Sequence, residues 1–328
     1  MLRGLVCAIA LLFPALAWAE DAPEQSELSE QQKITWPLPW RRGAPLEYDQ
    51  TFESVNRKGE LSVAVKGSDI VRISIERADS DGFVQRWIST DPKLDVDQLP
   101  AAMRTVMRST AQAFKGLALD VRLNKDGTYQ GLLNLAELQP RYRNAMMAIM
   151  TKASLLPGKA PTPEATAMVT RMVDMIAAPA VVEAQFAEEP VAYNFIAGGG
   201  LAMDTEYEYE DQGTNPIGGQ PIRTVNTLSM NQASNPAQYE VHWRVVPDAA
   251  ETTAMIKDFT REMFKDQKEM PVGEVDKVLA QLSIDADFST TVTYLVSKVT
   301  GIVERMETVQ VKKIGSKNES KRTVMSLR

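Results

Sequence analysis

Hydrophobic residues alternate with polar ones along several short segments of this chain, which is the pattern of half-buried strands. One such segment begins at Leu46, a second surrounds Ile73, and a third covers Phe83 to Thr90. A helical period of hydrophobic residues follows over about Asp97 to Phe114, and a hairpin comes after it. We therefore expect a β-β-β-α-β-β unit over residues 45–135.

The same pattern recurs in the second half of the chain, which indicates an internal repeat. Leu46–Ser54 aligns with Leu201–Tyr209 at an offset of 155 residues, and an offset of 156 places Trp87 on Trp243. A second α+β unit is therefore expected over residues 198–328. Together these observations predict an internally duplicated α+β protein, with antiparallel sheets and helices covering one face. The pattern leaves open whether the halves share one curved sheet or form two packed domains.

Helical patterns also appear outside the repeat. The helix of the second unit is expected to begin at Asp248, and a short additional helix is expected over Glu274–Leu282. A linking region over residues 136–197 has no counterpart in either unit and contains two helical patterns. One begins at Pro140 and the other at Pro163, where a proline fits the first turn of a helix. A helical pair is therefore expected to join the halves.

Residues 1–19 have the three parts of a secretory signal. Arg3 supplies a basic start, Leu5–Leu16 is almost wholly apolar, and an Ala-x-Ala site ends at Ala19. The apolar run is shorter than the roughly 20 residues that span a bilayer. We expect cleavage after Ala19, export to the bacterial periplasm, and a disordered or extended leader over residues 20–44.

The amino-acid composition argues against thiol chemistry and against nucleic-acid binding. The one cysteine, Cys7, lies in the predicted signal, so disulfides and thiolate chemistry are not expected in the mature chain. No later segment approaches membrane-spanning length. The formal net charge of −7 does not favour a nucleic-acid partner, because phosphate binding needs clustered cations. The oligomeric state is left open.

Basic residues cluster only near the C-terminus and at Arg41-Arg42. On an acidic protein, the C-terminal cluster fits a solvated strand edge that discourages pairing. A second hypothesis is contact with anionic lipid headgroups. The residues of the C-terminal cluster are Lys312, Lys313, Lys317, Lys321 and Arg322.

Candidate catalytic residues are few. The single histidine, His242, lies on the polar face of a strand beside Glu240 and Arg244, where a solvated side chain is expected. The common zinc sites need further His or Cys ligands, and the familiar serine-nucleophile and nucleotide-binding motifs do not occur. Acidic residues between Asp204 and Asp211 follow a period of two, which is typical of the solvated face of a strand. No catalytic residue, cofactor site or metal site is predicted.

Methionine and tryptophan residues are the candidates for lining a ligand site or binding a partner. Methionines crowd the two linking helices, where they either fill the core or form a lid that bounds an apolar pocket. The candidate ligand-lining residues are Met146, Met150, Met168, Met172, Trp87 and Trp243. The segment Trp36-Pro-Leu-Pro-Trp40 is held extended by its two prolines. Its tryptophans are expected to pack onto the folded body, or else to bind a partner.

Three functions follow from these observations. The first is a non-catalytic binding protein of the envelope, which holds an apolar ligand or an envelope protein between its sheet and its methionine-rich helices. Curved antiparallel sheets covered by helices often carry lipids or lipoproteins in this compartment, although such an analogy concerns the fold alone. The alternative is an interaction or assembly factor without a ligand pocket, acting through Trp36 and Trp40. The third is an envelope hydrolase that uses carboxylates.

Overall fold

A computed structural model gives the arrangement of most of the chain. It describes residues 33–58, 61–99, 101–154, 162–213, 221–264, 286–314 and 317–328. The predicted signal over residues 1–19, the first part of the predicted leader and the short helix expected over 274–282 lie outside the described residues.

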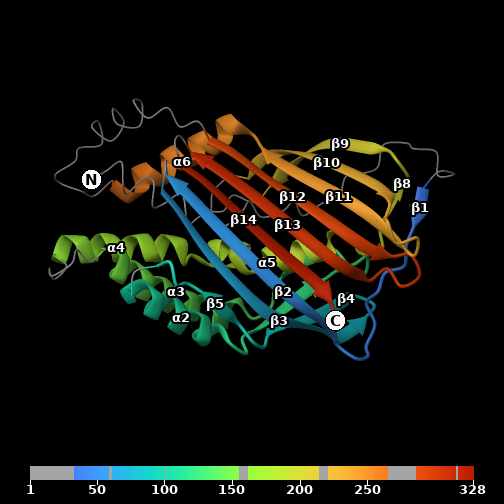
Figure 1. Cartoon of the computed structure of the whole chain (residues 1–328), viewed down its shortest axis with the longest axis horizontal. Coiled ribbons are helices and arrows are strands. Elements are labelled where there is room, and N and C mark those ends of the chain that lie inside the picture. Colours follow the sequence, from blue (N-terminus) through green and yellow to red (C-terminus); the bar gives the residue numbers. More distant parts are fainter. Residues whose placement is uncertain are drawn as a thin grey trace.

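A twelve-stranded antiparallel sheet forms the frame of the molecule (Figure 1). Eleven strands follow the order β7-β6-β4-β3-β2-β14-β13-β12-β11-β10-β9, and β5 pairs with β3 beside them. β1 and β8 form a separate two-stranded sheet. The strands are β1 (Lys33–Thr35), β2 (Leu46–Lys58), β3 (Leu61–Asp79), β4 (Gly82–Ser89), β5 (Lys93–Asp95), β6 (Ala118–Leu123), β7 (Tyr129–Leu132), β8 (Gly200–Ala202), β9 (Glu206–Gly213), β10 (Ile222–Gln232), β11 (Gln238–Pro247), β12 (Ala286–Ser297), β13 (Val303–Ile314) and β14 (Lys317–Leu327).

The two halves of the chain meet in the middle of this sheet. β14 pairs with β2 from Lys317 opposite Lys58 to Leu327 opposite Tyr48. The halves therefore share one continuous sheet. The prediction that the basic C-terminal cluster forms a strand edge is wrong, since β14 is paired on both sides. The physical reason is the alternation along β14, which buries side chains such as Met325.

The pairing registers agree with the predicted offsets in one hairpin of each half. Ile73 pairs with Trp87 as Leu228 pairs with Trp243. The preceding hairpin departs from the offset of 155, which would place Leu201 opposite Leu228, whereas Leu201 pairs with β1. Each half departs from the predicted β-β-β-α-β-β order by added strands, β5 before α2 in the first half and β8 and β14 at the ends of the second. Descent from a duplication stays a prediction.

Three helices, rather than the predicted pair, join the halves. The helix α5 was missed because it has no polar stripe: buried residues lie on all of its sides, so its sequence lacks the amphipathic period. Pro179 opens it at a position that proline tolerates. The described helices are α2 (Ala101–Phe114), α3 (Leu135–Ser154), α4 (Pro163–Ile176), α5 (Pro179–Phe195) and α6 (Ala249–Phe264). Among them, none is long and apolar enough to cross a membrane.

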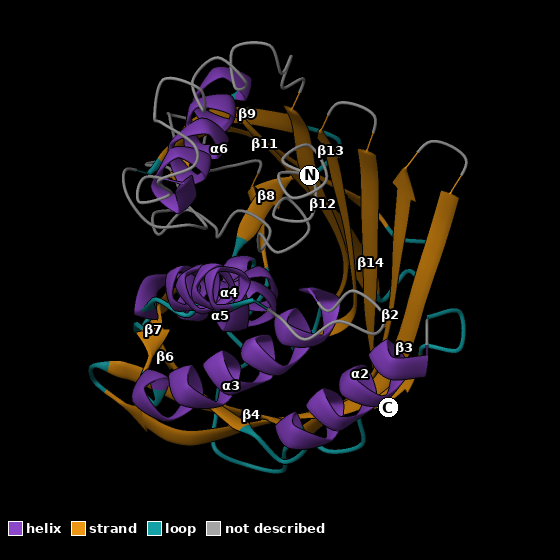
Figure 2. Ribbon diagram, turned by 90° about the vertical axis from the view of Figure 1, so that its left-hand side faces the viewer, coloured by secondary structure: helices purple, strands orange, loops and turns teal. Residues whose placement is uncertain are grey.

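The sheet is curved, and α3, α4 and α5 lie on its concave side (Figure 2). The predicted covering of one face by helices is therefore confirmed. The convex face carries exposed ion pairs between neighbouring strands, such as Arg72 with Glu47 at 2.6 Å and Arg322 with Glu307 at 2.7 Å. Pairs of this kind contribute about 0–1 kcal/mol each, so the convex face is a solvated surface and the core lies on the concave side.

Candidate functional site

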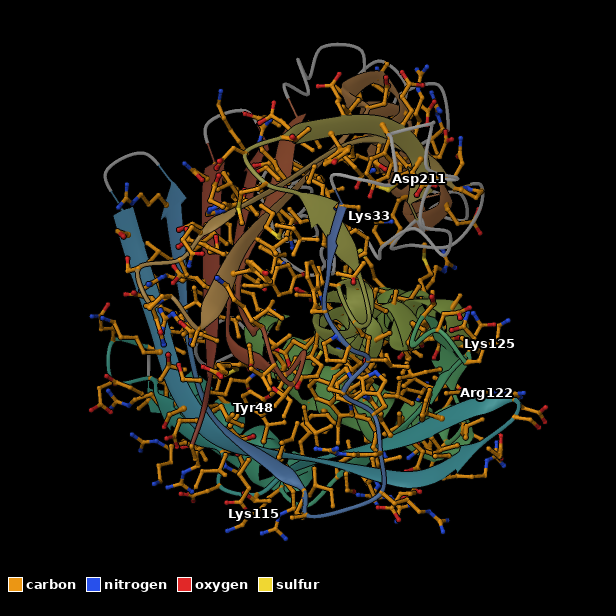
Figure 3. The ribbon with its side chains drawn as sticks, turned by 90° about the vertical axis from the view of Figure 1, so that its right-hand side faces the viewer. Lys33, Tyr48, Lys115, Arg122, Lys125 and Asp211 are labelled. Carbon is orange, nitrogen blue, oxygen red and sulfur yellow. The ribbon has the colours of Figure 1, made fainter. Side chains whose placement is uncertain are left out.

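The N-terminal residues 33–44, which we call the strap, cross one end of the concave side (Figure 3). The Trp36 indole nitrogen donates to the Ile196 carbonyl oxygen at 2.8 Å, and the Trp36 backbone nitrogen donates to Gly199. The Trp40 ring lies 5.6 Å from the Tyr193 ring. Both tryptophans are buried, so the segment packs onto the folded body. We call this end of the sheet the strap end.

Three glycines allow the strap to pack closely against the loops beneath it. The Pro37 carbonyl oxygen lies directly against Gly301, in the turn between β12 and β13. Leu38 lies against Gly127 and Gly198, in the loops after β6 and α5. All three glycines have positive φ, a conformation that other residues rarely adopt. The strap therefore packs against three separate loops of the strap end.

α5 fills the concave side next to the strap. The Tyr193 hydroxyl lies 2.6 Å from the Tyr48 hydroxyl, which donates to the Val303 carbonyl oxygen. The Asn194 amide exchanges hydrogen bonds with Gln85 on β4, at 2.9 and 3.0 Å. Burial raises the pKa of Tyr193 well above its ordinary value, so this hydroxyl stays protonated. At this end, α5 and the sheet form a packed core with paired polar groups.

The inner face of the sheet becomes polar away from the strap. We call the opposite end, where β13 ends at Ile314 and β14 begins at Lys317, the distal end. Towards the strap the inward residues of these two strands are Met306 and Met325, which are fully buried. Towards the distal end the inward residues of β13, β14 and the neighbouring β2 are Thr308, Gln310, Lys312, Thr323, Lys321, Glu319, Gln50 and Ser54.

We call these inward residues at the distal end the distal patch, and some of its charged side chains contact α5. The Glu188 carboxylate accepts a hydrogen bond from the Gln310 amide and lies 3.6 Å from the Lys321 ammonium. The side chain of Glu188 is 7% exposed, but that of Lys321 is 32% exposed. The Glu319 carboxylate accepts from the Ser54 hydroxyl at 3.5 Å, and its other oxygen is buried without a hydrogen-bond partner. Such incomplete pairing is unusual inside a protein.

Burial shifts the pKa values of this patch. It raises the pKa of the Glu189 carboxyl, although nearby Lys321 opposes the shift. The carboxylate of Glu188 raises the pKa of Lys321, so the Lys321 ammonium keeps its charge. Burial lowers the pKa of Lys312, and the attraction of Glu319 and Glu188 offsets only part of the effect.

The structure separates the candidate ligand-lining residues. Trp87 and Trp243 are 3% and 1% exposed, and they pack on Tyr193 and Phe195 of α5. Met172 is likewise buried in the core. The other candidates, Met146, Met150 and Met168, are partly exposed on α3 and α4. Their role in lining a ligand site stays a prediction.

A groove of about 930 Å³ follows α4 on the side that faces away from its buried residues, which include Met172 and Val173. None of the four candidate methionines lines it. The residues that line it are Pro163, Thr166, Ala167, Thr170, Arg171, Asp174 and Met175. The groove is therefore lined by one face of α4.

The residues considered for catalysis lie on solvated surfaces. The His242 ring nitrogen Nε2 lies 2.8 Å from a Glu240 carboxylate oxygen, and Nδ1 lies 3.2 Å from the Thr293 hydroxyl. Glu206, Glu208 and Glu210 are exposed along β9. Within the described ranges, no group of three or more His, Cys, Asp or Glu is placed to hold a metal ion.

The basic cluster, taken as one unit, did not predict the distal patch. In an antiparallel strand, successive side chains point to opposite faces. Lys312 and Lys321 therefore point inward, whereas their neighbours Lys313 and Arg322 point outward. A period of two applied to residues 312–322 would have separated the inward lysines.

Comparisons with known proteins give only distant likenesses. No protein-family model and no curated protein matches the chain. The structure resembles lipovitellin, from a study of its lipid–protein interactions, with 9% identity and a TM-score of 0.43; the likeness covers 88% of this chain and 25% of that one. DynF from the dynemicin biosynthesis pathway of Micromonospora chersina has 6% identity and a TM-score of 0.22, covering 95% of this chain and 94% of that one.

A third likeness is to the MucA/MucB complex of Pseudomonas aeruginosa, with 11% identity and a TM-score of 0.11. It covers 86% of this chain and 89% of the matched chain. This chain thus spans about a quarter of the lipovitellin chain, and the three likenesses do not place it in a family.

Proposed function

We propose that this protein is a non-catalytic binding protein of the bacterial envelope, exported by residues 1–19, which holds an apolar ligand on the concave side of its sheet. The observation that carries the proposal is the exposure of Lys321. This side chain points toward α5 and pairs with buried Glu188, yet it remains 32% exposed. An inward side chain stays exposed where there is space beside it, which supports an opening among the described residues at the distal end of the concave side.

The walls around the distal patch fit a ligand with an apolar chain and a polar end. The sheet contributes polar groups on β13 and β14. We expect the partly exposed Met146, Met150 and Met168 of α3 and α4 to line the same space. Ligand sites of this kind are mostly apolar and contain a few placed polar groups. Flexible thioether side chains adapt to acyl chains of different shape.

The two other functions are less well supported. A partner that binds Trp36 and Trp40 would first have to displace the strap, because both side chains are buried. A carboxylate hydrolase would use the acids of the distal patch, where Glu188 already accepts a hydrogen bond from Gln310 and lies beside Lys321.

Filling the distal concave side should block ligand binding. Ser54 points inward on β2, opposite Lys321 in register, whereas the next residue, Val55, points outward. We expect Ser54→Trp to weaken binding of tritiated hexadecanol about tenfold or more, a loss of at least about 1.4 kcal/mol. Equilibrium dialysis of the purified, delipidated protein measures this affinity.

Val55→Trp is the matched control, since it places the same indole on the convex face of the same strand. It should bind hexadecanol as the unmodified protein does. Equal binding by the Ser54 and Val55 variants would contradict the proposed position of the ligand. No saturable binding by the unmodified protein would contradict the proposed function.

A further inference from the structure

The strap is held to the rest of the molecule mainly through its first part. There β1 pairs with β8 along its whole length. The Trp36 backbone nitrogen donates to the Gly199 carbonyl oxygen at 3.2 Å, and the Trp36 indole nitrogen donates to the Ile196 carbonyl oxygen at 2.8 Å. Backbone pairing and a buried side-chain bond therefore add to the packing of this part of the strap.

Residues 38–45, which we call the latch, have few bonds of this kind. No backbone hydrogen bond joins them to another residue that the structure describes. The Arg42 guanidinium donates to the Glu76 carbonyl oxygen at 2.7 Å, on the exposed surface. The inward side chains of the latch, Leu38 and Trp40, pack on the core. The latch is thus held by packing and by one exposed side-chain bond.

Trp40 carries a buried N–H group without an acceptor. Trp40 is 7% exposed and Trp36 is 4% exposed, so the two indoles are almost equally buried. The Trp36 N–H is paired, whereas the Trp40 N–H has no hydrogen-bond partner among the described residues. Water would pair this group as soon as Trp40 left its place. The released state of Trp40 therefore gains a hydrogen bond that the docked state lacks.

The latch has enough chain to move without disturbing the sheet. Residues 41–45 are exposed, and the pairing of β2 begins only at Leu46. Segments with few hydrogen bonds open at low free energy while the rest of a protein stays folded. We propose that the latch opens as a unit, with β1 and Trp36 still docked. Opening removes Trp40 from the Tyr193 ring, 5.6 Å away, and uncovers Tyr193 at the strap end of the concave side.

Hydrogen exchange of the indole N–H groups tests the latch without any ligand. In the ¹⁵N-labelled protein, Trp36→Phe and Trp40→Phe assign the two indole signals. After transfer to D₂O, we expect the Trp40 N–H to exchange at least about tenfold faster than the Trp36 N–H. Trp243, whose N–H donates to Asn226, gives a second slow reference. Equal rates for Trp36 and Trp40 would overturn the proposal.

Arg42→Ala tests whether the exchange of Trp40 goes through opening of the latch. Loss of the bond to Glu76 should speed the exchange of Trp40 about threefold and leave that of Trp36 unchanged. Arg41→Ala is the matched control, since Arg41 is the adjacent exposed arginine and takes no part in this bond. An unchanged Trp40 rate in Arg42→Ala would show that its N–H exchanges without opening of the latch. An equal acceleration of Trp36 and Trp40 would show that the strap opens as a whole. Either result would contradict the latch.

Discussion

Replacing Trp243 by alanine is expected to lower the free energy of unfolding by about 3–5 kcal/mol. The indole is 1% exposed and stacks on the Phe195 ring with a centroid distance of 3.4 Å. Its nitrogen donates to the buried Asn226 amide oxygen at 3.1 Å, so the substitution leaves both a cavity and an unpaired polar group. Guanidinium unfolding followed by circular dichroism measures the loss.

This prediction separates a core role of Trp243 from a ligand-lining role. A residue that mainly lines a ligand site would change ligand binding and leave the unfolding free energy of the empty protein nearly unchanged. Val299→Ala is the control, since Val299 is 82% exposed and a change there should stay within about 0.5 kcal/mol. A loss of less than about 1 kcal/mol for Trp243→Ala would contradict the packing of α5 on β11 described above.

Replacing Gly301 by alanine is expected to displace the strap and to cost about 3 kcal/mol of stability. A Cβ atom at this position would lie 1.8 Å from the Pro37 carbonyl oxygen, and Gly301 has a φ of +69°. The new methyl group therefore adds both a clash with backbone and a strained conformation. Guanidinium unfolding gives the loss, and limited proteolysis should show earlier cleavage within residues 33–44.

Gly43→Ala is the matched control within the strap. A Cβ atom at Gly43 would meet nothing within 4 Å, so its effect should stay within about 0.5 kcal/mol. If the two alanine variants unfold and are cleaved alike, the strap does not depend on its contact with the β12–β13 turn.

Alternating and helical periods were sufficient to predict most of the strands and the helices α2, α4 and α6. These periods fail where an element is buried on all sides, as α5 is, because no polar stripe then marks it. The continuity of the sheet also had no local signal. It depends on the pairing of Tyr48 with Leu327, and no short-range pattern in the sequence links positions so far apart.

The burial of the candidate ligand-lining residues could not be predicted from the sequence. Crowded methionines drew attention to α3 and α4, but their burial depends on tertiary packing, which places Met172 in the core and leaves Met168 partly exposed. The pairing of Glu188 with Lys321 could not be predicted, because it requires α5 to cross the sheet at β14. The sequence contains the period of two that turns Lys312 inward. Which face is the inner one can be assigned only when β13 is known to pair with β12 and β14.

The most direct test of a bound ligand is native mass spectrometry of the protein, expressed from the full chain and purified gently from a bacterial envelope fraction. We expect a mass above that of the polypeptide which is lost after extraction with organic solvent, together with an apolar compound in the extract. A spectrum that shows only the bare polypeptide before extraction would contradict a stably held ligand on the concave side.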